Sequence, residues 1–353
     1  MSKKFQISKL KEHRTSGSTG KPFKYYISGA EDEWRKSIYM RANITCGQRL
    51  RDNWVVVTSP HHFGDTTKIQ RIIGIYAQDY VSVFDDVKEQ IQSIEKFKPD
   101  VLDGYSGSLY LIAKEAKENE THKIEPRIIF GSADSIDLQS RHLIEEVFEA
   151  PFYDQFGCGE VDRTAWQCTN KEGYHMDIDS VLMQFLDKEG DEVAPGEQGE
   201  IVYTSLFNYA QPFIRYAIND IGEPSDDECP CGITLPLMNV VEGRKDSYIV
   251  LPGGRLLSPM GFWSIMRTYP DTYKIDKFQV IQKKVNEIDI LIKLIDFKNH
   301  IEIQNTLIEH IYNCLNIKNN EIYLNIDFVD DIPLDNTGKL RSVISHVEKE
   351  GYI

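Results

Sequence analysis

Short apolar runs alternate with stretches of helical periodicity through the first two thirds of the chain. Mostly apolar runs predict buried strands at residues 54–57, 127–130 and 151–156. Between them Val87, Ile91 and Ile94 recur at helical spacing, and a second helical pattern covers residues 109–116. This alternation of strand and helix predicts an α/β domain layered around a largely parallel sheet.

The pattern changes at about residue 178. Two apolar runs, 181–185 and 201–204, flank a polar turn, which predicts a β-rich part that is either a small sheet or a barrel. A break falls near residues 243–246, and beyond it the pattern predicts a hairpin, a helix and another strand. The chain is therefore expected to fold as a large N-terminal α/β lobe with a small β-rich part, residues 1–244, followed by a small α+β lobe, residues 245–353.

Length and charge narrow the classes of protein to which the chain can belong. Its 353 residues suffice for about two domains. The net charge of −15 argues against general nucleic-acid binding and requires any anionic ligand to be held by local cations and backbone dipoles. No apolar run approaches the ~20 residues of a membrane helix, and the N-terminus lacks the features of a signal peptide. A cytoplasmic location without membrane or nucleic-acid partners is the expectation.

A loop near the start has the composition of a phosphate-binding loop. Glycines let backbone N–H groups approach phosphate oxygens, hydroxyls add donors, and Lys21 adds a point charge. The loop reads Thr15, Ser16, Gly17, Ser18, Thr19, Gly20, Lys21. It is not a Walker loop, because Thr15 stands where the first glycine would be and Pro22 follows the lysine. Taken alone, a flexible Ser/Gly turn explains it equally well.

Four further motifs follow at wide intervals. They are Phe156-Gly157-Cys158-Gly159-Glu160, the run from Arg215 to Asp220, Gly243-Arg244-Lys245-Asp246, and the run from Pro333 to Lys339. In the first, a tight turn after a strand aims Glu160 into a crevice, where open α/β sheets bind ligands. In the second, Asp220 can bind both hydroxyls of a ribose. Each motif alone is also compatible with a plain turn or with solvated surface.

Together, the five motifs in this order resemble the adenylate-forming ligases, and within them the phenylacetate–coenzyme A ligase branch. The resemblance covers the chain from about residue 13 to the C-terminus, and it implies that the C-terminal lobe is mobile about a hinge at Asp246. It also implies that residues 15–21 hold the pyrophosphate end of ATP and that Asp220 and Arg244 bind the ribose. Glu160 would hold Mg²⁺, and Lys339 would bridge the carboxylate and the α-phosphate as a catalytic cation.

The same resemblance places the carboxylate substrate. Its pocket would comprise Tyr105, Gly131, Ser132, Ala133, Phe156 and Gly157. The sequence Gly131-Ser132-Ala133-Asp134 departs from the Ala-Gly-Glu-type sequence of related enzymes, which leaves an aryl substrate in doubt. The neighbouring pair His61-His62 either lines this pocket or lies at the surface.

Four of the residues suited to zinc fall in two short segments. Cys229 and Cys231 form a two-cysteine knuckle, and Cys168 and His175 lie close together upstream. Three thiolates and an imidazole complete a tetrahedral structural zinc site, which would pin the segment after Glu160 to the loop before the hinge. The phenylacetate ligase branch has similar elements in these places. Cys46 and Cys314 are expected to be ordinary buried cysteines.

The predicted function is therefore an AMP-forming acid–thiol ligase. It would activate a small carboxylic acid as acyl-AMP with ATP and Mg²⁺, and transfer the acyl group to coenzyme A. The alternatives are an amide ligase or carrier-protein loader, and a zinc-stabilised nucleotide-binding subunit without activity. An unrelated phosphotransferase is disfavoured by the order of the motifs. Related ligases have a further segment before the phosphate loop, which a second polypeptide would replace in a split enzyme. The resemblance is also compatible with a homodimer.

Overall fold

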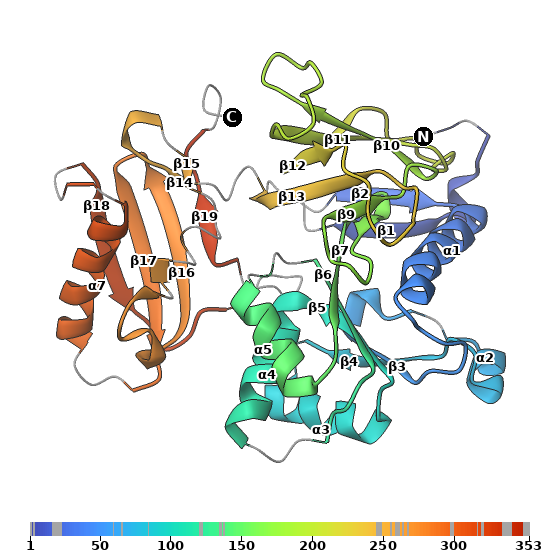
Figure 1. Ribbon diagram of the computed structural model, residues 1–353, viewed down its shortest axis with the longest axis horizontal. Coiled ribbons are helices and arrows are strands. Elements are labelled where there is room, and N and C mark those ends of the chain that lie inside the picture. The colour runs from blue at the N-terminus through green and yellow to red at the C-terminus, as the bar shows by residue number, and fades with distance from the viewer. Residues whose placement is uncertain are drawn as a thin grey trace.

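A computed structural model describes most of the chain (Figure 1). The described residues are 2, 4–15, 23–58, 60–64, 66–83, 85–119, 123–133, 136, 138–244, 249–254, 256–257, 262, 265–266, 268–296, 300–315, 317–318, 321–333 and 341–348. Most of the strands of residues 1–244 form one eleven-stranded sheet in the order β10-β11-β12-β13-β9-β8-β7-β6-β5-β3-β4.

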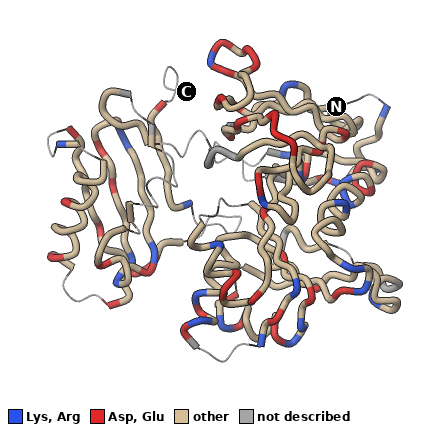
Figure 2. Tube along the Cα trace, viewed as in Figure 1, with Lys and Arg blue, Asp and Glu red and all other residues tan. Residues whose placement is uncertain are grey.

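The first half of this sheet is parallel and buried on both faces. Its strands are β4 (Gln78–Ser82), β3 (Trp54–Thr58), β5 (Val101–Tyr105), β6 (Ile128–Ser132) and the start of β7 (Phe152–Cys158). Alternate side chains face opposite ways, so Val55 and Leu102 pack in the core under α3–α5 while Trp54 and Val101 pack with α1. The strands are accordingly almost uninterrupted apolar runs. Figure 2 shows many of the charged residues of this part along its helices and loops.

Helices cover these two faces. Their bounds are α1 (Gly29–Thr45), α2 (Lys68–Ile73), α3 (Val87–Phe97), α4 (Ser106–Asn119) and α5 (Leu138–Phe148). Helix α1 begins at a capping box, in which the Ser28 side chain accepts from the backbone N–H of Glu31 and the Glu31 carboxylate accepts from that of Ser28. Glu31 also accepts from the backbone N–H of Ala210 at 2.9 Å, which ties the start of α1 to the β-rich part.

The second half of the sheet is antiparallel. Its strands are the end of β7, β8 (Asp162–Trp166), β9 (Tyr174–Met176), β13 (Leu237–Arg244), β12 (Tyr216–Ser225), β11 (Gly199–Ser205) and β10 (Val181–Leu186). The β-rich part is thus neither a separate sheet nor a barrel, because β7 pairs parallel with β6 through residue 154 and antiparallel with β8 from Gln155 onward. The expected largely parallel sheet holds only for the first half.

A separate hairpin precedes α1. Strands β1 (Lys11–Thr15) and β2 (Phe23–Ile27) pair antiparallel from Lys11 opposite Ile27 to Thr15 opposite Phe23. The described residues also include short 3-10 helices, which are η1 (Ile7–Lys9), η2 (Pro60–His62), η4 (Pro252–Gly254) and η5 (Thr272–Lys274).

The C-terminal lobe has its own sheet and its own core (Figure 1, orange to red). A small ladder of β14 (Ile249–Val250) and β15 (Leu256–Leu257) precedes a four-stranded sheet. That sheet has the order β18 (Tyr323–Phe328), β17 (Glu287–Leu294), β16 (Ile275–Lys284), β19 (Val343–Ser345), and α7 (His300–Leu315) packs against it. The predicted hairpin, helix and strand of this region are confirmed. The boundary at 244/245 stays a prediction.

One buried amide joins the parts of this lobe. The Gln282 side chain accepts from the backbone N–H of Val250 at 2.9 Å and donates to its carbonyl at 2.6 Å, and Ser345 Oγ donates to it at 2.8 Å. Because Gln282 is fully buried, leaving these groups unpaired would destabilise β14, β16 and β19 together. No helix among the described residues is long and apolar enough to cross a membrane.

Candidate active site

The hairpin β1–β2 holds the two ends of the predicted phosphate loop. Thr15 and Phe23 close the ladder, so residues 16–22 form the connection between two antiparallel strands. Tyr25 and Ile27 of β2 are buried in the core of the β-rich part, which anchors this hairpin. The predicted contacts Ser16, Gly17, Ser18, Thr19, Gly20 and Lys21 lie outside the described residues, as does the side chain of Thr15, and they stay predictions.

Glu160 lies in the turn between β7 and β8 and is only 7% exposed. Its Oε1 accepts a hydrogen bond from Tyr216 Oη of β12 at 2.8 Å. Its backbone carbonyl accepts from Asn208 Nδ2 at 3.0 Å and from the guanidinium of Arg35. Burial and then the Glu160 charge raise the pKa of Tyr216, so its hydroxyl stays a donor. Three distant segments therefore hold Glu160 at the end of β7, two through its backbone carbonyl and one through its carboxylate.

The two predicted ribose contacts lie opposite each other. Asp220 of β12 pairs across the ladder with Arg244 of β13, whose side chain lies outside the described residues. Asp220 is partly buried and lies close enough to Cys158 to act on it electrostatically. Burial, followed by the charges of Glu160 and Asp220, raises the pKa of Cys158 well above its usual value. A protonated thiol is a poor nucleophile, so Cys158 is placed beside the site without a covalent role.

The predicted carboxylate pocket lies at the carboxyl ends of β5, β6 and β7. Tyr105 pairs with Ser132 in the register of β5 and β6, and Phe156 and Gly157 continue β7 beyond that edge. Ala133 follows at the surface with a φ of 71°, an uncommon conformation for a residue with a side chain. The six residues thus gather along one edge, where α/β sheets bind ligands.

Packing alone accounts for the two glycines of this pocket. A Cβ on Gly131 would lie 2.0 Å from Phe152 Cζ, and one on Gly157 would lie 2.2 Å from the carbonyl oxygen of Asp162. Both positions therefore need glycine because other atoms approach closely. Ligand contact at either one remains a prediction.

His62 is the member of the His61-His62 pair that reaches the pocket edge. Its Nδ1 lies 2.8 Å from Tyr105 Oη, and the two rings meet edge to face. The side chain of His61 lies outside the described residues. Lys339 and the hinge residue Asp246 lie outside them as well, so their predicted roles are untested.

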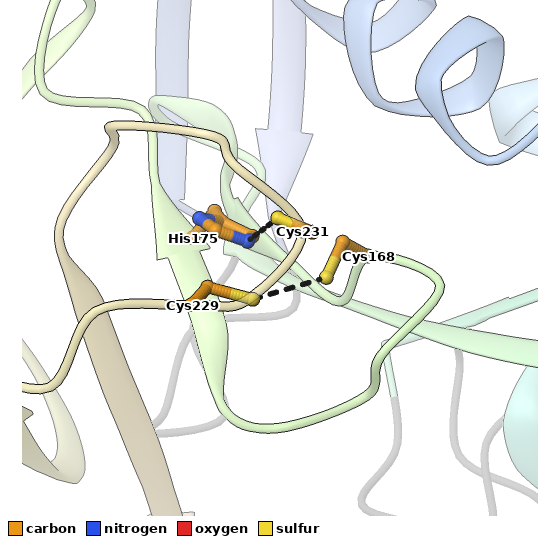
Figure 3. A group of neighbouring side chains, drawn as sticks. All are labelled: Cys168, His175, Cys229 and Cys231. Atoms are coloured by element: carbon orange, nitrogen blue, oxygen red, sulfur yellow. Dashed lines mark hydrogen bonds between the residues drawn. The ribbon is translucent and has the colours of Figure 1, made fainter.

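The four predicted zinc ligands come together (Figure 3). Cys168 follows β8, His175 lies in β9, and Cys229 and Cys231 lie in the loop between β12 and β13. Their ligand atoms all lie within 4.8 Å of one another, with Cys168 Sγ 3.5 Å from Cys229 Sγ and Cys231 Sγ 3.3 Å from His175 Nε2. This is the donor set and the compactness that a tetrahedral zinc site needs.

The surroundings of this cluster also suit a metal. His175 Nδ1 lies 3.2 Å from the carbonyl oxygen of Leu235, so Nδ1 carries the proton and Nε2 points inward. Burial lowers the pKa of His175, which favours the neutral imidazole that a metal requires. Backbone N–H groups of Asn170 and Ile233 donate to Cys168 Sγ and Cys231 Sγ, each at 3.4 Å.

The remaining cysteines differ from each other. Cys46 is buried, as expected, and donates to the carbonyl of Gln167. The expectation that Cys314 is buried is wrong, because Cys314 is exposed. It follows the buried Ile311 and Tyr312 on α7 but falls on the face that points away from the sheet.

Comparisons with known proteins agree with this fold. Residues 250–346 match the family described as the CapK C-terminal domain. Protein CapK of Staphylococcus aureus is 23% identical over 267 residues, which cover 75% of this chain and 57% of that protein. The phenylacetate–coenzyme A ligase of Thermus thermophilus is 21% identical over 208 residues, 57% of this chain and 46% of that enzyme.

A solved structure covers nearly the whole chain. The 2-hydroxyisobutyryl-CoA ligase in its postadenylation state aligns with 99% of this chain and 76% of its own, at a TM-score of 0.73 and 16% identity. The chain is thus similar in fold to adenylate-forming ligases and similar in sequence to phenylacetate–coenzyme A ligases. The resemblance to the phenylacetate–coenzyme A ligase branch and the expected α/β fold class with a C-terminal α+β lobe are confirmed. The chain spans about half the length of the curated relatives it matches.

Sequence reasoning missed three residues that hold this candidate site together. Arg35 and Asn208 bind the Glu160 carbonyl, and Tyr216 binds its carboxylate. Tyr216 lies inside a motif, yet the motif gave no role to it. Arg35 and Asn208 lie 125 and 48 residues away from Glu160 and belong to no motif, so only the fold brings them there.

Proposed function

We propose that this chain is an ATP-dependent acid–thiol ligase that forms an acyl-AMP and passes the acyl group to coenzyme A. The observation that supports this most is the convergence of Glu160, the Asp220–Arg244 cross-strand pair and the ends of the phosphate-loop hairpin in an adenylate-forming ligase fold. The curated relatives include coenzyme A ligases, and one structural neighbour, a 2-hydroxyisobutyryl-CoA ligase, was solved in complex with R3-HIB-AMP.

In the proposed first step, a carboxylate oxygen bonds to the α-phosphorus of ATP and the bond to the bridging oxygen breaks. Acyl-AMP and pyrophosphate result. Residues 15–21 hold the phosphates, Asp220 and Arg244 hold the ribose, and Lys339 bridges the two anions so that their repulsion is reduced. Glu160 would hold Mg²⁺, which supplies further neutralisation of the charge on the phosphates when it is bound.

In the second step, the thiol sulfur bonds to the acyl carbon, the proton of the thiol is lost and AMP leaves. The C-terminal lobe, with its own core, would turn about Asp246 between the two steps. Tyr105, Gly131, Ser132, Ala133, Phe156 and Gly157 would line the acid pocket in both.

We further propose that the Cys168–His175–Cys229–Cys231 cluster holds a structural zinc ion. Four protein ligands leave no position for a reacting water, so the ion would support the fold and take no part in the chemistry. It would join the segment after β8 to the loop between β12 and β13, on strands that border the nucleotide residues.

Exchange of labelled pyrophosphate into ATP tests the ligase proposal. We expect exchange that depends on one class within a panel of carboxylic acids, on Mg²⁺ and on Lys339, and release of AMP once coenzyme A is added. Replacing coenzyme A by carrier-protein thiols and by amines distinguishes the acceptors. Absence of exchange with every acid, together with a Lys339→Ala variant that matches wild type in nucleotide binding, would rule out adenylation.

A further inference from the structure

Arg35 of α1 lies between the phosphate-loop hairpin and the turn that carries Glu160. It is 8% exposed, although it carries a charge. Its Nη1 donates to the carbonyl of Gly159 at 2.9 Å, and its Nη2 donates to the carbonyl of Glu160. Two donors of one rigid guanidinium thus hold two successive carbonyls, which fixes the turn and the direction in which the Glu160 side chain leaves it.

The flat sides of the same guanidinium contact aromatic rings. Its Cζ lies 5.6 Å from the centre of the Tyr25 ring on β2 and 5.8 Å from that of Phe207. Such stacking is attractive, and more so where water is excluded. Tyr25 is 5% exposed, and His13 of β1 stacks on it with ring centres 5.3 Å apart. Arg35 therefore packs against Tyr25 of the hairpin while its N–H groups hold the Glu160 turn.

A second chain of contacts joins the same two parts. The Tyr25 ring meets Phe213 edge-on at 6.5 Å, Phe213 lies 5.1 Å from the Tyr216 ring, and the Tyr216 hydroxyl binds Glu160. The contacts of this second chain are between aromatic rings, which can shift against each other, whereas the two charged hydrogen bonds of Arg35 are directional. Arg35 thus joins the hairpin to the Glu160 turn in one residue: it packs against Tyr25 and holds the turn by two directional hydrogen bonds.

We infer that Arg35 is a positioning residue that fixes the hairpin β1–β2, whose connection is the predicted phosphate loop, relative to Glu160. The inference rests on the proposed function, in which the loop holds the terminal phosphates and Glu160 holds the Mg²⁺ that these phosphates share. A ligand that spans both, Mg·ATP, needs the two parts at one separation. AMP lacks the terminal phosphates and needs only the ribose residues.

Calorimetric titration of Arg35→Met with Mg·ATP and with AMP tests this inference. We expect affinity for Mg·ATP to fall by about tenfold, the effect of losing charged hydrogen bonds, and affinity for AMP to stay within about twofold. Arg35→Lys keeps a donor and a cation, so its affinity for Mg·ATP should fall by less than that of Arg35→Met. Tyr25→Leu removes the stacked ring and should also weaken Mg·ATP more than AMP.

Arg41→Met is the matched control. Arg41 lies on the same helix and also makes charged hydrogen bonds, but to Asp177 and Asp179, away from Glu160. It should lower the melting temperature without separating the two affinities. If Arg35→Met does not fold, as judged by circular dichroism, Arg35→Lys decides the same comparison.

The outcomes separate the two proposals. Wild type that binds neither nucleotide overturns the proposed function and this inference with it. If the wild type binds Mg·ATP and the Arg35 variants bind it equally well, only the role of Arg35 is overturned. The same holds if the variants lose affinity for Mg·ATP and for AMP in equal measure.

Discussion

Single residues in this protein hold conformations that their neighbours in sequence do not explain. Glu160 ends a recognisable motif, so a carboxylate at this edge of the sheet could be predicted from the sequence. The contacts that aim it could not, because Arg35 and Asn208 are ordinary residues of a helix and a loop in any local reading. His62 shows the same limit, since its neighbour Tyr105 lies 43 residues further along the chain.

Asp103 makes the free energy of unfolding depend on pH. It is buried in β5 and accepts a hydrogen bond from Tyr39 Oη at 2.8 Å. Burial raises its pKa to about 7, so the folded protein keeps this proton over a pH range in which the unfolded chain has lost it. The group thus weakens the fold progressively as the pH rises from about 4 to about 7, and the full cost remains above that range.

We expect Asp103→Asn to remove this dependence, because the amide is neutral at every pH and still offers an acceptor to Tyr39. From pH 5 to pH 8 the wild type should lose about 2 kcal/mol of unfolding free energy more than the variant. Urea denaturation of both proteins at the two pH values measures this, and other titrating groups cancel in the difference. Parallel pH curves would contradict the assigned cause.

At the scale of elements, most of what could be predicted came from apolar periodicity. The strands β3, β6 and β7 and the helices α3, α4 and α7 lie within a few residues of their predicted places. The junction of the two half-sheets was not foreseen, because periodicity reports which face a residue takes and not which strand lies beside it. The gathering of Cys168, His175, Cys229 and Cys231 could be foreseen from a two-cysteine knuckle and from similar elements in the phenylacetate ligase branch, and zinc itself stays a prediction.

The metal cluster carries the prediction at this scale. We expect one zinc ion per chain, and its loss in the Cys229→Ser/Cys231→Ser double variant, because two of four ligands disappear. Amide exchange should then rise around β9 and in the loop before β13, while the C-terminal lobe keeps its protection. Elemental analysis with hydrogen exchange measures both.

Cys314→Ser serves as the control for this experiment, since that exposed thiol lies on α7, far along the chain from the cluster. It should keep the full metal content. A well-folded wild type purified without zinc, and unaffected by added zinc, would refute the site.

At the scale of the whole molecule, the two lobes have separate cores, and an ion pair joins them among the described residues. Lys114 Nζ of α4 lies 3.9 Å from Asp276 Oδ1 of β16, and both side chains are about one third exposed. Such a pair contributes little, about 1 kcal/mol at most. That weakness suits a lobe that is proposed to move, because a strong contact would hold it in one arrangement.

We expect Lys114→Glu to shift the lobes away from this arrangement by up to about fivefold in population, because attraction becomes repulsion. Distance measurements between spin labels on α5 and α7 report the shift, which should shrink at high salt. Lys117→Glu is matched to it, since Lys117 lies on the same helix but pairs with Glu146 of α5 at 2.9 Å. An equal shift in both variants would assign the effect to net charge alone.

Strand β7 has a consequence for how such a protein can be altered. Because it is parallel to one neighbour and antiparallel to the other, it belongs to both half-sheets. Phe156 and Gly157, proposed to touch the acid, stand a few residues before Glu160 on this one strand and its turn. A recombination that imports a new acid pocket from a relative must therefore cut before β7 or after β8. Any such exchange that changes the proposed acid pocket therefore also exchanges Glu160.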